Sequence, residues 1–397
     1  MQFEFDELMK VALVSQEGGG ISAVTFGLGM SFARKKIETT IFTSEATFGA
    51  AVTQTNKLNN YLELVHLPIP DMPPRNFWFH LLHSSKLSKL LSQFTVVHGV
   101  SPNSSVGYTF LPCRLRRPFV STLHSSPRMG LKLLSRQQLS SLTLHDIGLN
   151  LFEFPFNDFS EKRILLHSDH VAICSYTLMT ELAASRKIPW ERVSVIQNGV
   201  DFNEIEEIES SPANTQEKIS IIFAGRLFPS KGVISLLLAF KSLKSGFKNV
   251  HLNIFGKGPL EKRIAQFIKD NNLGDSVNML GRVPHKRLLA EVKKSDIVVF
   301  PSIQEAQSMF MLEAMACGKP LIAFDFPFAR EILTHMKTGV LAAPGDINDL
   351  CSKMELLVSD EKLRHRLGQA AYDHIKRNHN WKIQAEKYLR IYESVIP

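Results

Sequence analysis

The sequence has few cysteines and no membrane-length apolar run, and these absences exclude several protein classes. Glycine and proline together make up only 41 of the 397 residues, which excludes collagen-like and low-complexity chains. No apolar stretch approaches the roughly 20 residues of a membrane-spanning helix. The four cysteines are widely spaced and form no Cys-x-x-Cys pair, lying at Cys113, Cys174, Cys317 and Cys351. This spacing predicts reduced thiols and argues against a disulfide scaffold or a zinc cluster.

The N-terminus lacks the basic start of a secretory signal. Glu4, Asp6 and Glu7 lie within the first ten residues, where a signal peptide carries lysine or arginine. Together with the reduced cysteines, this predicts a cytoplasmic protein. At roughly 150 residues per domain, the length of the chain predicts two or three domains.

Acidic residues are missing from one long stretch of the N-terminal half. Residues 73–145, called the basic window below, contain no aspartate or glutamate but hold nine of the 46 lysines and arginines. The rest of the chain has 37 basic and 38 acidic residues, so the net charge of +8 comes from this window. Such a stretch indicates either a generic solvated surface or a surface that binds an anionic partner.

Short apolar runs alternate with longer helical patterns along the chain. Strands are predicted over residues 11–14, 39–42, 95–97, 118–123 and 170–174, and then over 219–224, 250–255, 276–280, 297–300 and 320–323. One helical pattern follows the glycine-rich turn at 18–20 and ends near residue 34. Further helical patterns cover 232–243, 288–294 and 309–316. This alternation predicts an α/β protein whose parallel sheets are covered on both faces.

The pattern restarts after about residue 200, which predicts two doubly wound domains. The segment 204–217 is rich in glutamate and serine, a composition typical of a linker. The first domain is therefore placed at 1–203 and the second at 204–375. Ligands of open parallel sheets bind outside the carboxyl ends of the strands, so two facing Rossmann-like domains predict a site in the cleft between them.

The segment Phe-Ala-Gly-Arg-Leu-Phe-Pro-Ser-Lys-Gly at 223–232 is the strongest candidate for an anion site. Its strand ends at Ala224, and Arg226 and Lys231 follow on a loop that opens a helix. The N–H groups and dipole of a helix N-terminus add to the charge of these side chains. Arginine can also grip a diphosphate with paired donors. The alternative is a pair of solvated loop cations.

Two glutamates follow another predicted strand. Glu305 lies after the strand 297–300, and Glu313 falls in the second turn of a helix that starts near Ser308. Carboxylates at this position can accept hydrogen bonds from sugar or ribose hydroxyls, while the first N–H groups of the helix face a ligand above the sheet. The alternative is a helix stabilised by acid near its positive end, plus one exposed glutamate.

Two histidines and a glycine loop lie near strand ends of the first half. His124 follows the strand 118–123 and is expected at the cleft, whereas a structural role is the simpler explanation for His98. The glycine loop lacks the Gly-x-Gly-x-x-Gly spacing of a dinucleotide site. It predicts a close approach of substrate to the backbone. The loop consists of Gly18, Gly19 and Gly20.

In combination, these segments resemble the retaining, nucleotide-sugar-dependent glycosyltransferases with the GT-B fold. The resemblance is to the family 4 type (glycosyl transferases group 1), which includes the phosphatidylinositol mannosyltransferases. It runs from residue 11 to Trp381 and implies that 376–397 forms a last helix returning to the first domain. It rests on the order and spacing of the glycine loop and of the segments 121–124, 168–175, 195–201, 225–232, 255–259 and 313–320.

The resemblance implies a role for each candidate residue. Arg226 and Lys231 would hold the donor diphosphate and stabilise the leaving group, and Glu305 would contact hydroxyls of the donor sugar. Glu313 would bind the ribose, and His124 would lie beside the sugar at the reacting face. Further donor contacts would come from the glycine loop and from backbone amides, at Gly18, Gly19, Gly20, Ser308, Met309 and Phe310.

The resemblance also implies that no metal or other cofactor is needed beyond the nucleotide-sugar co-substrate. The sequence agrees, because it contains no Asp-x-Asp motif and no evident carboxylate cluster for magnesium. Three places depart from the family pattern. Ala-Gln-Ser at 306–308 and Asp-Phe-Pro-Phe at 325–328 replace segments often rich in glycine, and Lys257 stands where an acid is frequent. These departures affect the expected donor more than the expected fold.

The leading hypothesis is an enzyme that transfers a hexose or N-acetylhexosamine from a UDP- or GDP-sugar to an acceptor bound by the first domain. Aromatic and basic residues over 75–89 suit an anionic bilayer surface, which predicts a lipid-linked or membrane-associated acceptor and peripheral attachment to the cytoplasmic membrane face. A core-facing helix with solvated cations is the alternative. A nucleotide-sugar epimerase and a non-catalytic sugar- or partner-binding protein are the two other functions considered. The basic window contains no nucleic-acid motif.

Overall fold

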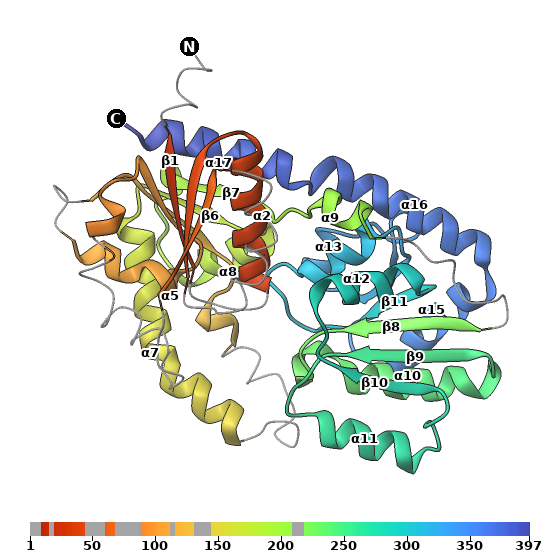
Figure 1. The fold of residues 1–397 in the computed structure, drawn as a ribbon. Coiled ribbons are helices and arrows are strands. Elements are labelled where there is room, and N and C mark those ends of the chain that lie inside the picture. Colours follow the sequence, from red (N-terminus) through yellow and green to blue (C-terminus); the bar gives the residue numbers. More distant parts are fainter. Residues whose placement is uncertain are drawn as a thin grey trace. The chain divides into compact units, whose positions relative to one another are not determined.

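In the computed structural model the chain forms two compact units, which Figure 1 colours along the sequence. Unit 1 comprises residues 1–132, 145–199 and 381–397, and unit 2 comprises 133–144 and 200–380. The main part of unit 2 begins at Val200, and the chain returns to unit 1 at Trp381. The structure describes residues 9–15, 20–43, 60–67, 87, 89–111, 116–130, 144–208 and 218–397.

Unit 1 is built on a parallel sheet of seven strands in the order β3-β2-β1-β4-β5-β6-β7. The central strands are continuous buried runs, as expected for a sheet with helices on both faces. The strands are β1 (Lys10–Ser15), β2 (Glu38–Thr43), β3 (Leu62–His66), β4 (Val96–Gly99), β5 (Phe119–Leu123), β6 (His170–Ile173) and β7 (Val193–Val195).

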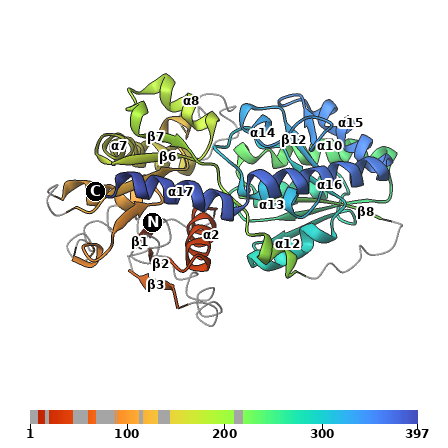
Figure 2. The ribbon, with the colours of Figure 1, turned by 90° about the horizontal axis from the view of Figure 1, so that it is seen from above.

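The helices of unit 1 lie on both faces of this sheet. The last helix, α17, packs against α2 on one face, while α7 and α8 cover the other (Figures 1 and 2). Gly27 of α2 permits this packing, because a Cβ at Gly27 would lie 2.2 Å from Nε1 of Trp381. The helices are α2 (Gly20–Arg34), α5 (Pro102–Ser105), α7 (Leu144–His167), α8 (Tyr176–Ser185) and α17 (Trp381–Val395).

His98 of β4 ties α17 to the sheet. One ring nitrogen lies 2.6 Å from the hydroxyl of Tyr392 in α17, and the other lies 2.7 Å from the hydroxyl of Thr122 in β5. Burial, with a smaller effect of His124, lowers the pKa of His98 to about 3, so the ring is neutral. Both nitrogens are satisfied inside the core, which confirms the structural role predicted for His98.

Unit 2 repeats the architecture on a parallel sheet of six strands in the order β10-β9-β8-β11-β12-β13. One continuous apolar core includes the buried residues of this sheet and of the helices around it. The strands are β8 (Ile219–Ala224), β9 (Val250–Phe255), β10 (Val277–Gly281), β11 (Ile297–Phe300), β12 (Leu321–Phe324) and β13 (Val340–Ala342).

The helices of unit 2 also lie on both faces of their sheet. Helices α10, α11 and α15 lie on one face, and α12, α13 and α16 lie on the other (Figure 1). The helices are α9 (Phe202–Glu206), α10 (Val233–Gly246), α11 (Glu261–Asp270), α12 (His285–Lys294), α13 (Met309–Ala316), α14 (Pro327–Arg330), α15 (Ile347–Ser359) and α16 (Glu361–Asn378).

The start of the expected linker at 204–217 is folded. Asp201 caps the short helix α9 by accepting a hydrogen bond from the N–H of Asn203. Phe202 and Ile205 of this helix are buried in the core of unit 2. The polar composition of the segment gave no indication of these two buried side chains. Residues 209–217 lie outside the described part of the chain.

Both sheets are doubly wound, which confirms the predicted α/β fold class. The strand order reverses between β1 and β4 in unit 1 and between β8 and β11 in unit 2. Open sheets of this kind bind ligands at the carboxyl ends of the strands on either side of such a switch point. In the described part of the chain, no helix combines the length and apolar character needed to span a bilayer.

Candidate functional site

The loops that follow β8 and β11 meet at the switch point of unit 2. The carbonyl oxygen of Ser230 accepts hydrogen bonds from the N–H of Ile303 at 2.9 Å and from the hydroxyl of Ser302 at 3.0 Å. Gly232 has a left-handed φ of 68°, and a Cβ there would lie 1.9 Å from the carbonyl oxygen of Pro301. Only glycine fits this contact, which brings the end of the Lys231 loop against the loop after β11.

Lys231 and Glu305, predicted from separate segments, are in direct contact. The ammonium group of Lys231 donates a hydrogen bond to Oε1 of Glu305, and the hydroxyl of Ser302 donates to the same oxygen at 2.9 Å. Each of the two charged side chains is only 14% exposed. The structure thus places an ordered cation and an ordered carboxylate where ligands of such sheets bind.

Arg226 lies on the same loop after β8 as Lys231, but its side chain is exposed. Its guanidinium group lies 5.0 Å from the ring centroid of Phe228. The loop after β9 braces the backbone here, because the N–H of Leu227 donates to the carbonyl of Lys257 at 2.9 Å. Lys257 itself is exposed. An exposed guanidinium on a braced loop has donors to offer an anionic ligand.

Helix α13 begins beside the Lys231–Glu305 pair. The hydroxyl of Ser308 caps the helix by accepting a hydrogen bond from the N–H of Met311 at 3.3 Å. Phe310 packs on Phe300 at the end of β11, with ring centroids 5.8 Å apart. Ser308 is therefore the N-cap, as predicted, and the N–H groups of the first turn begin directly after the Glu305 loop.

Glu313, in the second turn of α13, is buried rather than exposed. Its Oε1 lies 3.0 Å from Nε2 of His285, the first residue of α12. Nδ1 of the same ring lies 3.1 Å from Oε1 of Glu204 in α9. Burial opposes the charge of the ring, but Glu313 and Glu204 together raise the pKa of His285 to about 10.

Sequence reasoning missed His285 and Glu204 as parts of this site. One signal was available: α13 reads Met-Phe-Met-Leu-Glu-Ala-Met-Ala, which is apolar on every side. Such a helix is buried, so its single carboxylate needs a partner. The sequence gives no indication that this partner is a histidine 28 residues away.

Two further predicted residues, His124 and Gly20, belong to unit 1. His124 follows β5, and its Nε2 is buried without a hydrogen-bond partner among the described residues. Burial lowers the pKa of His124 to about 4, so the ring is neutral at pH 7. Gly20 is the first residue of α2. Gly18 and Gly19 lie outside the described residues.

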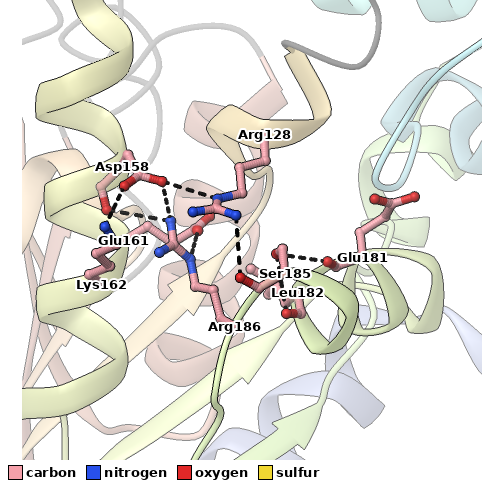
Figure 3. Close-up of polar contacts among 8 residues, drawn as sticks. All are labelled: Arg128, Asp158, Glu161, Lys162, Glu181, Leu182, Ser185 and Arg186. Carbon is pink, nitrogen blue, oxygen red and sulfur yellow. Dashed lines mark hydrogen bonds and ion pairs between the residues drawn. The ribbon is translucent and has the colours of Figure 1, made fainter.

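An ion-pair network in unit 1 connects α7, α8 and the segment after His124 (Figure 3). Arg186, which follows α8, contacts Asp158 and Glu161 of α7, each at 2.5 Å. Asp158 also contacts Lys162 at 2.9 Å and Nε of Arg128 at 3.3 Å. Arg186 and Glu161 are nearly buried, so their charges depend on this pairing.

A pocket of about 580 Å³ opens beside the network. Arg128 on its wall is 40% exposed and also donates to the carbonyl of Ser185 at 3.3 Å. Figure 3 shows Arg128, Ser185 and Glu181 around this region. The pocket is lined by Ser126, Arg128, Met129, Phe154, Glu181, Ala184 and Ser185. Its mixture of apolar and hydrogen-bonding side chains suits a polar organic ligand.

Much of the basic window lies outside the described residues, including the segment 75–86 expected at a membrane. Two of its described cations are engaged with backbone. Arg116 donates to the carbonyl of His167 at 3.2 Å, and Arg117 donates to that of Ser92 at 2.8 Å. Within the described ranges, no group of three or more metal-ligating side chains is found.

Comparison with known proteins agrees with this fold. Residues 204–374 match the family model of the glycosyl transferases group 1, and residues 18–204 match that of glycosyltransferase family 4. An uncharacterised glycosyltransferase of Methanocaldococcus jannaschii is 24% identical over 342 residues, covering 83% of this chain and 81% of that protein. The phosphatidyl-myo-inositol mannosyltransferase of Mycobacterium leprae is 25% identical over 304 residues, covering 76% and 74%.

A solved structure shares the fold along almost the whole length. Anabaena HepE, determined in complex with UDP and glucose, superposes with a TM-score of 0.74 at 18% identity, covering 97% of this chain and 100% of that one. The two family models together span residues 18–374. This chain therefore belongs to the family 4 type of glycosyltransferases and has the GT-B fold.

Proposed function

We propose that this glycosyltransferase moves a hexose or an N-acetylhexosamine from a UDP- or GDP-sugar to its acceptor, with retention of anomeric configuration and without a metal ion. The observation that carries the proposal is the Lys231–Glu305 pair at the switch point of unit 2. A cation suits the diphosphate of a donor, and a neighbouring carboxylate suits the hydroxyls of its sugar.

The transfer breaks the bond between C1 of the sugar and the phosphate oxygen and forms a bond between C1 and the acceptor oxygen. For retention, we assign attack from the face on which the diphosphate departs, with the acceptor proton passing to the departing phosphate oxygen. Lys231 and the exposed Arg226 offset the negative charge that develops on this oxygen. In this scheme the two cations supply what a metal ion supplies in other transferases.

Glu305 is assigned to the donor sugar. Lys231 and Ser302 both contact Oε1 of Glu305. Its Oε2 is the oxygen that we assign to a sugar hydroxyl, since an ionised carboxylate accepts several hydrogen bonds. The N-terminus of α13 follows directly and is assigned to the phosphates, because the N–H groups of a first helical turn attract anions.

The acceptor is proposed to be lipid-linked or held at a membrane surface, and to contact unit 1. Supporting observations are the nine cations and no acids of the basic window, and the lipid named in the mannosyltransferase of Mycobacterium leprae. We assign a polar part of the acceptor to the pocket beside Arg128. The neutral His124 is assigned to the reacting sugar, where its unpartnered Nε2 can accept a hydrogen bond from a sugar hydroxyl.

The test is a transfer assay with the full chain, a panel of UDP- and GDP-sugars and vesicles that contain phosphatidylinositol. Mass spectrometry identifies a glycosylated product, and NMR of its anomeric proton reports the configuration. We expect transfer from one donor series, undiminished by EDTA, with retention. Inversion, dependence on a metal, or donor turnover to an epimer in the absence of acceptor would contradict the proposal.

Membrane attachment is tested separately by flotation with neutral and with anionic vesicles. The basic window predicts binding that requires anionic lipid and weakens with added salt. Equal, negligible flotation with both kinds of vesicle would remove the membrane part of the proposal while leaving the transfer reaction in place.

A further inference from the structure

Glu313 is held from one side by a single histidine. Its side chain is 9% exposed, and its Oε1 faces Nε2 of His285 at 3.0 Å. A carboxylate with so little water around it needs a charged or hydrogen-bonding partner to remain ionised. Among the described residues, His285 supplies the hydrogen bond to this carboxylate that the structure shows.

The ring of His285 must carry a proton on both nitrogens. Its second nitrogen, Nδ1, faces Oε1 of Glu204 at 3.1 Å. An ionised carboxylate only accepts hydrogen bonds, so each ring nitrogen has to donate. The neutral ring has one N–H donor, so its other nitrogen would face a carboxylate oxygen without a proton between them. A ring placed between two carboxylates at these distances therefore favours the imidazolium form.

The position of this cation is costly for its own helix. His285 is the first residue of α12, followed by Lys286 and Arg287, and the first turn contains no acid. The positive end of a helix dipole repels a cation. The two glutamates outweigh that repulsion, and they come from other elements, α9 and α13. The protonated ring therefore stabilises the contacts of α12 with α9 and α13 more than it stabilises helix α12 itself.

Extending the proposed function, and taking Glu313 as the residue for the donor ribose that the family resemblance implies, we propose that His285 is a positioning residue of the donor site. It fixes Glu313 through Oε1, so that Oε2 accepts a hydrogen bond from a ribose hydroxyl of the nucleoside diphosphate. Among the described residues, the charged groups that act on the ring are Glu204 of α9 and Glu313 of α13, and Lys286 of α12 acts on Glu204.

The same contact links the donor site to the first element of unit 2. Glu204 lies in α9, and Lys293 of α12 also donates to the carbonyl of Ile205 in α9 at 2.5 Å. Glu206 of α9 accepts from the hydroxyl of Tyr372 in α16 at 3.2 Å. Helix α9 is thus anchored to both neighbours, which gives His285 a firm support from which to orient Glu313.

Two substitutions separate the contacts of the ring. In His285→Gln the amide nitrogen lies near the former Nε2 and still donates to Glu313. In His285→Asn it lies near the former Nδ1 and donates only to Glu204. His365→Asn replaces a histidine of α16 that is 81% exposed and serves as the control. Thermal unfolding of each variant confirms that it is folded.

The measurement is calorimetric binding of UDP and GDP, of their 2′-deoxy and 3′-deoxy analogues, and of inorganic pyrophosphate. We expect the wild type to prefer the ribose form of one nucleotide over a deoxy analogue by about ten- to hundredfold, the value of one hydrogen bond to a charged group. His285→Asn should bring this preference close to one, His285→Gln should keep most of it, and pyrophosphate affinity should stay unchanged.

The outcomes distinguish this inference from the proposed function. A wild-type preference that survives in His285→Asn, or a wild type without any preference, overturns the role of His285 while leaving nucleotide binding intact. A wild type that binds neither nucleoside diphosphate overturns the proposed function and this inference with it. Loss of preference in His285→Asn with retention in His285→Gln and His365→Asn supports the inference.

Discussion

The ammonium group of Lys231 and the carboxylate of Glu305, 74 residues apart in sequence, are hydrogen-bonded to each other. The contact joins the loops after β8 and β11, the two strands between which the order of the second sheet reverses. Each group faces an opposite charge in a place where both side chains have little exposure to water. The predictions on donor binding follow from this pair and from the Glu313–His285 contact behind it.

Substitution of Glu305 tests the carboxylate of the pair. Glu305→Gln removes the charge that orders Lys231 and leaves an amide beside the ammonium group. Turnover should fall by about a hundredfold or more, as expected when a preorganised charged contact in an active site is lost. Steady-state kinetics check this, with Glu291→Gln as the control, since Glu291 of α12 is half-exposed and pairs locally with Lys294. Turnover within a factor of two of the wild type would contradict the assignment.

The sites of His98 and His124 in unit 1 should respond to substitution in opposite ways. Tyr392→Phe removes one of the two hydrogen-bond partners of His98 and should destabilise the fold by about 1–3 kcal/mol without altering turnover. His124→Ala should lower turnover by about tenfold, the value of one hydrogen bond, with little change in stability. Urea unfolding and transfer kinetics of both variants check this. Loss of activity in Tyr392→Phe at an unchanged stability would overturn the structural role of His98.

The network in Figure 3 predicts a large difference in stability between two arginine substitutions. Arg186→Met leaves the buried carboxylates of Asp158 and Glu161 without their main cation and should cost about 3–5 kcal/mol. Arg128→Gln should cost less than about 1 kcal/mol, because Arg128 is 40% exposed. Urea unfolding at neutral pH measures both. Equal effects would show that Arg186 is not the centre of the network.

The elevated pKa of His285 predicts how stability changes with pH. The folded ring titrates at about 10 and the unfolded ring at 6.5, so the folded state holds this proton more tightly. The stabilisation is complete below pH 6.5 and is lost as pH rises through about 10. The free energy of unfolding of the wild type, minus that of His285→Gln, should therefore shrink between about pH 6 and about pH 10. A difference in the free energy of unfolding that stays constant over this pH range would contradict a protonated His285 in the folded state.

The central strands could be predicted from sequence because they are continuous apolar runs. The strand expected at 219–224 is β8, and that at 297–300 is β11. The edge strands β3, β7 and β13 were not predicted. β7 and β13 have only three residues each, and β3 is largely half-exposed, so none presents a long apolar signal.

The donor side of the site was predicted only in part. Lys231 and Glu305 were found because each follows a buried strand, and parallel strands place such residues at one edge. His285 was missed because α12 was expected to begin at residue 288, which left the histidine in a loop. Its contacts with Glu204 and Glu313 span 81 and 28 residues and depend on how three helices pack. Residue spacing in the sequence does not predict contacts of this kind.

The most direct test of the central claim is release of nucleoside diphosphate from the preferred donor by the wild type and by Lys231→Ala, with exposed Lys241→Ala as the control. If Lys231 offsets the charge of the departing diphosphate, Lys231→Ala should fold normally by circular dichroism yet lose at least about a hundredfold in rate. Lys241→Ala should match the wild type. A folded Lys231→Ala that turns over donor at the wild-type rate would contradict the account.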